Sequence, residues 1–73
     1  MSGPPVKRSL TLSGHRTSVS LEDEFWQGFR TIAAARDMPI NALAAEIDAA
    51  RAPETGLASA IRVYVFQYYR RLI

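Results

Sequence analysis

Apolar and polar residues alternate with a period of two between residues 15 and 21. The apolar or β-branched positions and the polar positions form two sets, Thr17, Val19 and Leu21 against Arg16, Ser18 and Ser20. This period is typical of a half-buried strand. We therefore predict a strand over residues 15–21, with the first set facing the core.

Residues 7–12 alternate as well, but Leu10 and Leu12 stand on even numbers, one residue out of phase with the following strand. A slip of one residue exchanges the two faces of a strand, so Ser13 and Gly14 are predicted to form a turn or a bulge. Residues 7–12 are expected to be an extended arm, and whether they form a second strand stays open. With no second strong strand in the chain, the predicted strand is expected to pair with its copy in a second chain, antiparallel across a two-fold axis.

Three later stretches carry apolar residues at helical spacing and are predicted to be helices, over residues 22–36, 40–50 and 57–72. Pro39 separates the first two, because proline disfavours helical geometry in the residue before it. Acidic residues open the first helix and suit the positive end of its dipole, and Ser20 with Asp23 resembles a capping arrangement.

The faces of these helices predict what they bury. The core face of the first helix consists of Phe25, Phe29, Ile32 and Ala33. Trp26 lies beside this face, where it either packs at the rim of the core or stacks on Arg30 one turn later. The third helix carries an apolar stripe and further aromatic residues outside it, namely Leu57, Ile61, Val65, Tyr68 and Leu72 with Tyr64, Phe66 and Tyr69. A helix that is apolar on most sides predicts burial against a partner subunit.

The chain has 73 residues, which suffices for one small domain over residues 7–73 preceded by a flexible tail over residues 1–6. A domain of this size has a small core and usually needs additional stabilisation. There is no cysteine and one histidine, so disulfides and a histidine-based metal site are excluded. Association with a second copy is the remaining source of stability, and we expect a homodimer.

Charge is distributed unevenly along the chain. Residues 1–21 contain Lys7, Arg8 and Arg16 and no acid, whereas residues 22–61 are net acidic and residues 62–73 are basic again. A basic arm without acids indicates an anionic partner, with nucleic acid the first candidate, although an ordinary soluble N-terminus explains it equally well.

Catalytic, cofactor and membrane signals are missing from the sequence. His15 has no cysteine to act with, and the adjacent acids of residues 22–24 are explained by the helix dipole rather than by acid–base catalysis. The longest unbroken apolar stretch, residues 63–66, is far shorter than a membrane span, and no signal peptide is recognisable. We expect a cytoplasmic protein that is not an enzyme and uses no cofactor or metal.

Three segments carry a resemblance to a known family, residues 16–22, the pair Phe25-Trp26 and residues 38–43. Together they resemble the ribbon-helix-helix superfamily of bacterial DNA-binding proteins, the Arc and MetJ repressor type. The run Gly-His-Arg-Thr-Ser-Val-Ser-Leu-Glu is similar to a small branch of it that ends in an amphipathic helix. The resemblance covers residues 7–72. It implies a mainly α fold with one short β-strand, an intertwined two-fold dimer with an intersubunit antiparallel β-ribbon, and an additional C-terminal helix.

The resemblance also implies a function, that of a transcriptional regulator associated with the nucleoid, most simply a repressor, that inserts its ribbon into the major groove of double-stranded DNA. Base edges are then read by the polar set of strand positions, Arg16, Ser18 and Ser20. The strand alternation selects the same outward positions independently.

The resemblance further implies phosphate contacts at the start of the second helix, through the backbone amides of Ile40 and Asn41. From their place on the basic arm, we add Lys7 and Arg8 as phosphate contacts. Assembly beyond the dimer on DNA stays open. The alternative is a dimeric protein-interaction module, or an antitoxin-like protein, whose helix over residues 57–72 binds a protein partner.

Overall fold

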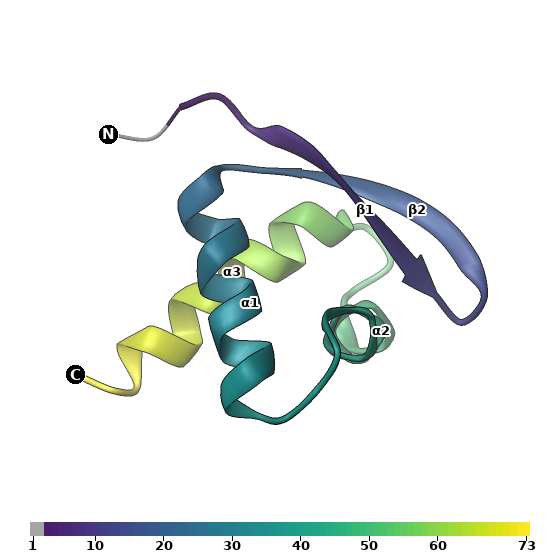
Figure 1. The fold of residues 1–73 in the computed structure, drawn as a ribbon. Coiled ribbons are helices and arrows are strands. Elements are labelled where there is room, and N and C mark those ends of the chain that lie inside the picture. Colours follow the sequence, from purple (N-terminus) through teal and green to yellow (C-terminus); the bar gives the residue numbers. More distant parts are fainter. Residues whose placement is uncertain (1–2) are drawn as a thin grey trace.

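The computed structural model describes residues 3–73 as two strands followed by three helices (Figure 1). The elements are β1 (Val6–Leu12), β2 (His15–Leu21), α1 (Asp23–Ala35), α2 (Ile40–Ala50) and α3 (Leu57–Arg70). The helix bounds lie within two residues of the predicted ranges. Of the predicted tail, residues 1–2 lie outside the described residues and Val6 belongs to β1.

The two strands form an antiparallel hairpin within the chain. Ser13 and Gly14 make the two-residue turn, with φ values of 51° and 83°. Positive φ at both central residues is typical of a type I′ turn, the geometry that matches the twist of a hairpin. Of the two predicted alternatives, a turn or a bulge, the turn is therefore the correct one.

The expectation that β2 lacks a partner in its own chain is wrong. The register pairs Leu10 with Thr17 and Arg8 with Val19, so even-numbered residues of β1 lie opposite odd-numbered residues of β2. Cross-strand partners share a face, and the phase change at the turn is therefore what an antiparallel hairpin requires. The fold has two strands instead of the single short strand expected.

The hairpin lies across one side of the three helices, with β1 against α2 and β2 against α3 (Figure 1). Every element except the turns contributes to one core, made of Leu10, Val19, Leu21, Trp26, Phe29, Ile32, Ala33, Leu43, Ala44, Ile47, Ile61 and Val65. Thr17, predicted to face inward, is exposed. It lines an open hollow near the turn, together with Asp48 and Arg51.

Helix α1 ends in a motif that reverses the chain toward α2. Asp37 adopts a left-handed φ of 56°, its amide donates to Ala34 O at 3.0 Å, and the Met38 amide donates to Ala33 O at 2.8 Å. This pair of bonds is a Schellman motif. At the other end the predicted capping by Ser20 and Asp23 is wrong. The N-cap residue is Glu22, with no side-chain capping bond, because its carboxylate is engaged by Arg62 at 2.8 Å.

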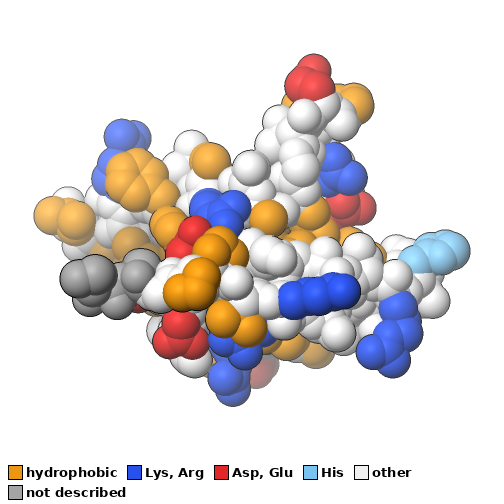
Figure 2. Space-filling model, turned by 90° about the horizontal axis from the view of Figure 1, so that it is seen from above, with side chains coloured by type: hydrophobic (Ala, Val, Ile, Leu, Met, Phe, Trp, Pro, Cys, Tyr) orange, Lys and Arg blue, Asp and Glu red, His pale blue; other side chains and the backbone are white. Residues whose placement is uncertain are grey.

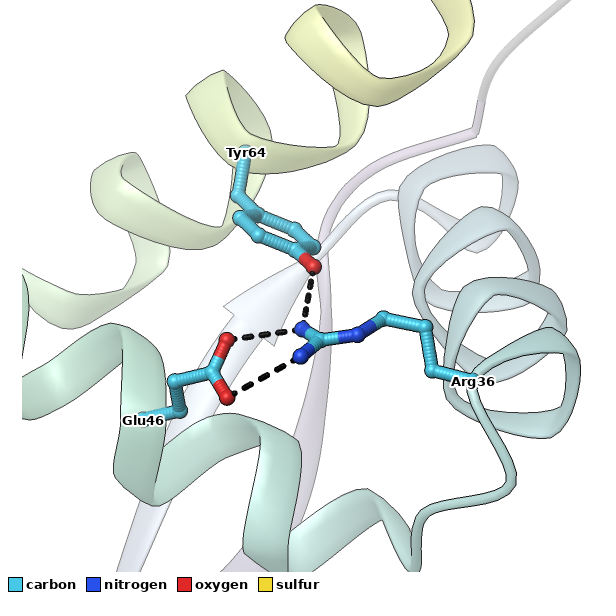
Figure 3. A network of polar contacts seen from close by, with 3 residues as sticks. All are labelled: Arg36, Glu46 and Tyr64. Carbon is cyan, nitrogen blue, oxygen red and sulfur yellow. Dashed lines mark hydrogen bonds and ion pairs between the residues drawn. The ribbon is translucent and has the colours of Figure 1, made fainter.

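Arg36, which directly follows α1, contacts the other two helices (Figure 3). Its guanidinium donates to both carboxylate oxygens of Glu46 in α2, at 2.7 and 3.2 Å, and to the hydroxyl of Tyr64 in α3 at 2.8 Å. The hydrogen bonds from Arg36 hold the pKa of Glu46 below its ordinary value, and those to Glu46 and Tyr64 raise the pKa of Arg36.

Candidate nucleic-acid interface

The side of the hairpin that faces away from the helices is polar throughout. The register and the strand alternation place six residues on it, Lys7, Ser9 and Thr11 from β1 and Arg16, Ser18 and Ser20 from β2. All six are exposed. We call them the outer face of the hairpin. This face combines two cations with four hydroxyl groups and contains no acid, so it offers charge to phosphates and hydrogen bonds to base edges.

Figure 2 looks onto this side of the molecule. The surface over the hairpin is mostly white with blue basic side chains, and the pale blue side chain, which belongs to the one histidine, marks the turn end. The orange side chains gather away from the turn, toward the other end of the molecule. The hairpin therefore projects a polar, basic surface.

The structure brings the three predicted base-reading residues, Arg16, Ser18 and Ser20, onto this face. Sequence reasoning missed Ser9 and Thr11, which lie directly opposite Ser18 and Arg16. The signal was present in the alternation of residues 7–12. Pairing that stretch with β2 through a two-residue turn would have placed its odd-numbered residues on the outer face.

The two cations expected to contact phosphate point to opposite sides of β1. Lys7 is exposed on the outer face, opposite Ser20. Arg8 lies on the inner side, with its guanidinium carbon 5.3 Å from the centre of the Trp26 ring and its Nη2 3.4 Å from Asp23 Oδ1. The stacking partner of Trp26 is thus Arg8 of β1, and the alternative pairing with Arg30 is wrong. Neighbouring residues of a strand face opposite sides, which is why these two cations separate.

The start of α2 lies beside the hairpin. Asn41 Oδ1 accepts a hydrogen bond of 3.0 Å from the backbone amide of Thr11. Pro39 precedes the helix as its N-cap and no side chain caps the first turn. The first amides of a helix have no partner within the helix and lie at the positive end of its dipole, so this end suits an anion. Asn41 thus stands at the edge of β1, whereas the half-buried side chain of Ile40 packs against the core.

Two acids at the start of α1, Glu22 and Asp23, are paired with cations. Glu22 accepts from Arg62 at 2.8 Å, and this hydrogen bond lowers the pKa of the Glu22 carboxyl. Arg62 also donates from Nη2 to Ser20 O at 3.1 Å, while Asp23 pairs with Arg8. The negative charge of these two acids near the base of the hairpin is thereby balanced.

A family model for a ribbon-helix-helix domain matches residues 5–69, nearly the whole chain. The chain belongs to the ribbon-helix-helix domain family. This confirms the resemblance on which the sequence-based expectation of fold and function rested. No match was found among curated proteins or among solved structures.

Ribbon-helix-helix domains are generally regulators that bind DNA as dimers. In this ribbon-helix-helix domain, the third helix leaves part of its apolar surface open. Ile61 and Val65 are buried, whereas four large apolar side chains at or beyond the helix are more than half exposed, namely Val63, Phe66, Leu72 and Ile73. Phe66 lines an apolar groove between α1 and α3. Within residues 3–73, no helix has the length and apolar character needed to cross a membrane.

Proposed function

We propose that this ribbon-helix-helix domain is a sequence-specific DNA-binding transcriptional regulator, acting as a repressor, whose β-ribbon enters the major groove of double-stranded DNA. The observation that carries the proposal is the outer face of the hairpin, which is basic, rich in hydroxyl groups and free of acids. Two strands lie about 4.8 Å apart, and a two-stranded ribbon fits the major groove, which is ~12 Å wide.

The proposed contacts follow from the chemistry of each side chain. Arg16 suits the O6 and N7 atoms of guanine, a bidentate contact worth about 1–3 kcal/mol of discrimination. Ser18 and Ser20 donate or accept single hydrogen bonds and discriminate less. Lys7 contacts a phosphate at the other end of the face, since an ammonium group acts there as a point charge.

The amides of Ile40 and Asn41 complete the proposed interface by binding a phosphate beside the ribbon. Arg8 was expected to contact phosphate, but its guanidinium is engaged with Trp26 and Asp23 on the inner side. We therefore assign Arg8 to the support of the hairpin. The amides of Ile40 and Asn41 are backbone groups that contact phosphate, so their contribution to binding is independent of the DNA sequence.

We infer that the domain acts as a homodimer on a repeated DNA site within the nucleoid, as the family generally does. The test is selection from a random duplex pool at moderate salt, with protein whose mass in solution has been established. Enrichment of an inverted or tandem repeat is the expected result. Recovery of no motif, with weak binding that disappears as salt rises, would overturn sequence-specific regulation.

A second candidate function is a protein-interaction module, which includes an antitoxin-like protein. The observation that favours it is the exposed apolar surface of α3, where Phe66 is 59% exposed beside an apolar groove. Contiguous apolar surface of this kind typically marks an interface. Replacement of Phe66 by Glu separates the two candidates. If the variant no longer binds a partner protein but still binds DNA, the result supports the interaction module.

A further inference from the structure

The first strand supplies half of the outer face of the hairpin, namely Lys7, Ser9 and Thr11. We propose that β1 is a phosphate-binding strand, which flanks the paired β2 strands of a dimer and contacts the DNA backbone at the wall of the major groove. This inference rests on the proposed function and deepens it, because it assigns sequence-independent contacts to β1 and leaves base reading to β2.

The edge of β2 that points away from β1 carries backbone groups for a further strand. The Thr11 amide donates away from β2, to Asn41 Oδ1 at 3.0 Å, so Thr11 and Arg16 form a non-hydrogen-bonded pair. Such pairs recur at every second residue. Three residues of β2 therefore point their backbone groups away from β1, namely Arg16, Ser18 and Ser20. Edge strands pair with other chains through such groups.

The bond between Arg62 and the end of β2 is compatible with a second strand on this edge. Arg62 Nη2 donates to Ser20 O at 3.1 Å, which confirms that this carbonyl points away from β1. A carbonyl oxygen has two lone pairs, so Ser20 O can accept a second hydrogen bond from a partner strand. We therefore expect β2 to pair with its copy along this edge.

Pairing of the two β2 strands makes a four-stranded sheet in which the β1 strands lie outermost. Neighbouring strands are about 4.8 Å apart, so each β2 lies ~2.4 Å and each β1 ~7.2 Å from the two-fold axis. The major groove is ~12 Å wide, and its walls therefore lie about 6 Å from its centre. The β2 strands fit between these walls, whereas the outer-face side chains of β1 are level with the phosphates.

The other edge of β1 is joined to the start of α2, where a phosphate site is already proposed. The Thr11 amide donates to Asn41, and β1 packs against α2. A phosphate bound by the first amides of α2 therefore lies on the β1 side of the hairpin. Thr11 and the start of α2 are thus placed to contact the same DNA backbone.

The side chains of β1 also suit phosphate by their chemistry. Lys7 carries a point charge, and the hydroxyl groups of Ser9 and Thr11 donate single hydrogen bonds. Lysine, serine and threonine are common partners of phosphate oxygens. The guanidinium on the outer face, which can bind guanine through two bonds, belongs to Arg16 of β2.

The first experiment tests whether β1 lies outside the paired β2 strands. The chain has no native cysteine, so each single variant introduces one thiol. An antiparallel pairing that uses all three β2 residues places Ser18 opposite its copy, with Cα atoms about 5.5 Å apart, within the range for a disulfide. The two copies of Ser9 are about 14 Å apart across the sheet.

The thiol variants are oxidised at a concentration where the protein has the mass of a dimer. We expect Ser18→Cys to form a disulfide-linked dimer on a non-reducing gel, and Ser9→Cys, the matched control on β1, to remain unlinked. If Ser18→Cys does not link faster than Ser9→Cys, β1 is not the outer strand and the inference is overturned.

The second experiment measures the phosphate contact of Lys7. Lys7→Ala removes one cation per chain from the outer face, and Arg71→Ala removes one from the exposed residue directly after α3. Each phosphate contact contributes ~0.9 to the slope of log affinity against log salt, so Lys7→Ala should lower this slope by about 1.8 for a dimer. Its affinity should fall by the same factor for the selected site and for an unrelated duplex. Arg71→Ala should keep the wild-type slope.

The hydroxyl contact is tested with a second pair of variants. Thr11→Val removes one hydroxyl and keeps the backbone bond to Asn41, and Thr31→Val makes the same change at an exposed position of α1. We expect Thr11→Val to weaken binding to both duplexes by about 2- to 12-fold for each hydroxyl lost, the worth of one hydrogen bond. Thr31→Val should match the wild type.

Neutral methylphosphonates, placed one at a time along the selected site, locate the phosphate that Lys7 contacts. The wild type should lose affinity when this phosphate is neutralised, whereas Lys7→Ala should not, because its contact is already absent. Equal losses for both proteins at every position would overturn the assignment of Lys7 to phosphate.

The outcomes separate the inference from the function on which it rests. If Lys7→Ala or Thr11→Val relaxes the preference at a base pair, β1 reads bases, and the inference fails while the proposed function stands. If neither variant changes the affinity or the salt slope, the inference fails as well. If the wild type selects no motif but binds duplexes in a salt-dependent manner, sequence-specific regulation fails, while a lower slope for Lys7→Ala still supports β1 as a phosphate-binding strand.

Discussion

Replacement of Leu10 by Ala tests whether β1 is an integral part of the fold. Leu10 is 2% exposed and packs in the core with residues from the other strand and from all three helices. Had residues 7–12 been only an extended arm, this side chain would contribute little to stability. In the hairpin its removal leaves a cavity beneath the sheet.

The expected cost follows from the burial of the side chain. A Leu→Ala change in a core lowers the free energy of unfolding by about 2–5 kcal/mol, through lost transfer free energy and the cavity that remains. A domain of 73 residues has a total stability of ~4–11 kcal/mol at the usual ~0.05–0.15 kcal/mol per residue. The variant is therefore expected to lose a large fraction of its stability, with a melting temperature lower by about 10 °C or more.

The measurement is urea denaturation followed by circular dichroism, with the wild type and Leu72→Ala alongside. Leu72 undergoes the same chemical change but is 68% exposed, so its replacement is expected to change the stability by less than about 0.5 kcal/mol. Equal stabilities for the two variants would refute the assignment of Leu10 to the core, and with it the pairing of β1 with β2. The protein concentration is the same for all three proteins, so that any dimerisation contributes equally to their measured stabilities.

Three further predictions concern the helices and the interface. Glu46→Gln should lower the melting temperature. Because Arg36 depresses the pKa of Glu46 in the folded state, the contribution of Glu46 to stability is present above the ordinary carboxyl pKa. This contribution is lost as the pH falls through the pKa that Glu46 has in the folded state. The stability difference between wild type and Glu46→Gln, measured from pH 7 to pH 3, should therefore shrink with acidification, and a difference that stays constant would contradict the link between Arg36 and Glu46. Asp37→Gly should raise the free energy of unfolding by about 0.5–1 kcal/mol, because glycine adopts the left-handed φ of 56° without a steric penalty; unchanged or lower stability in denaturation would count against it. Arg16→Ala should keep the wild-type circular dichroism spectrum and lose sequence preference in duplex selection, whereas an unchanged preference would remove Arg16 from base reading.

The helices were predictable because local signals agree with the final packing. Pro39 and the apolar spacing of the three helical stretches set their bounds to within two residues of those observed. Phe29, Ile32 and Ala33 are buried as their spacing predicted, whereas Phe25 is only half-buried and Trp26 is buried in the core. These signals depend on residues close together in the sequence, and the tertiary structure did not override them.

The contacts that sequence reasoning missed all join residues far apart in the chain or across the hairpin. The phase change at Ser13 and Gly14 was correctly taken as a turn or a bulge, yet the two strands were not paired with each other. Arg8 meets Trp26 and Arg62 meets Glu22, although nothing in the local spacing links either pair. A one-residue change of phase in the alternation indicates either a bulge in one strand or a turn that reverses the chain. The two structures are distinguished only by knowing which strand pairs with which.

Each helix makes a polar contact with the hairpin or its junction, and this has a consequence for α3. Asp23 of α1 pairs with Arg8, and Asn41 of α2 holds the edge of β1. Arg62 of α3 holds both Ser20 at the end of β2 and Glu22 at the start of α1. The third helix thus contacts both the end of β2 and the start of α1, at the junction where the hairpin joins the helices. If DNA enters as proposed, α3 contributes through Arg62 to the orientation of the reading face.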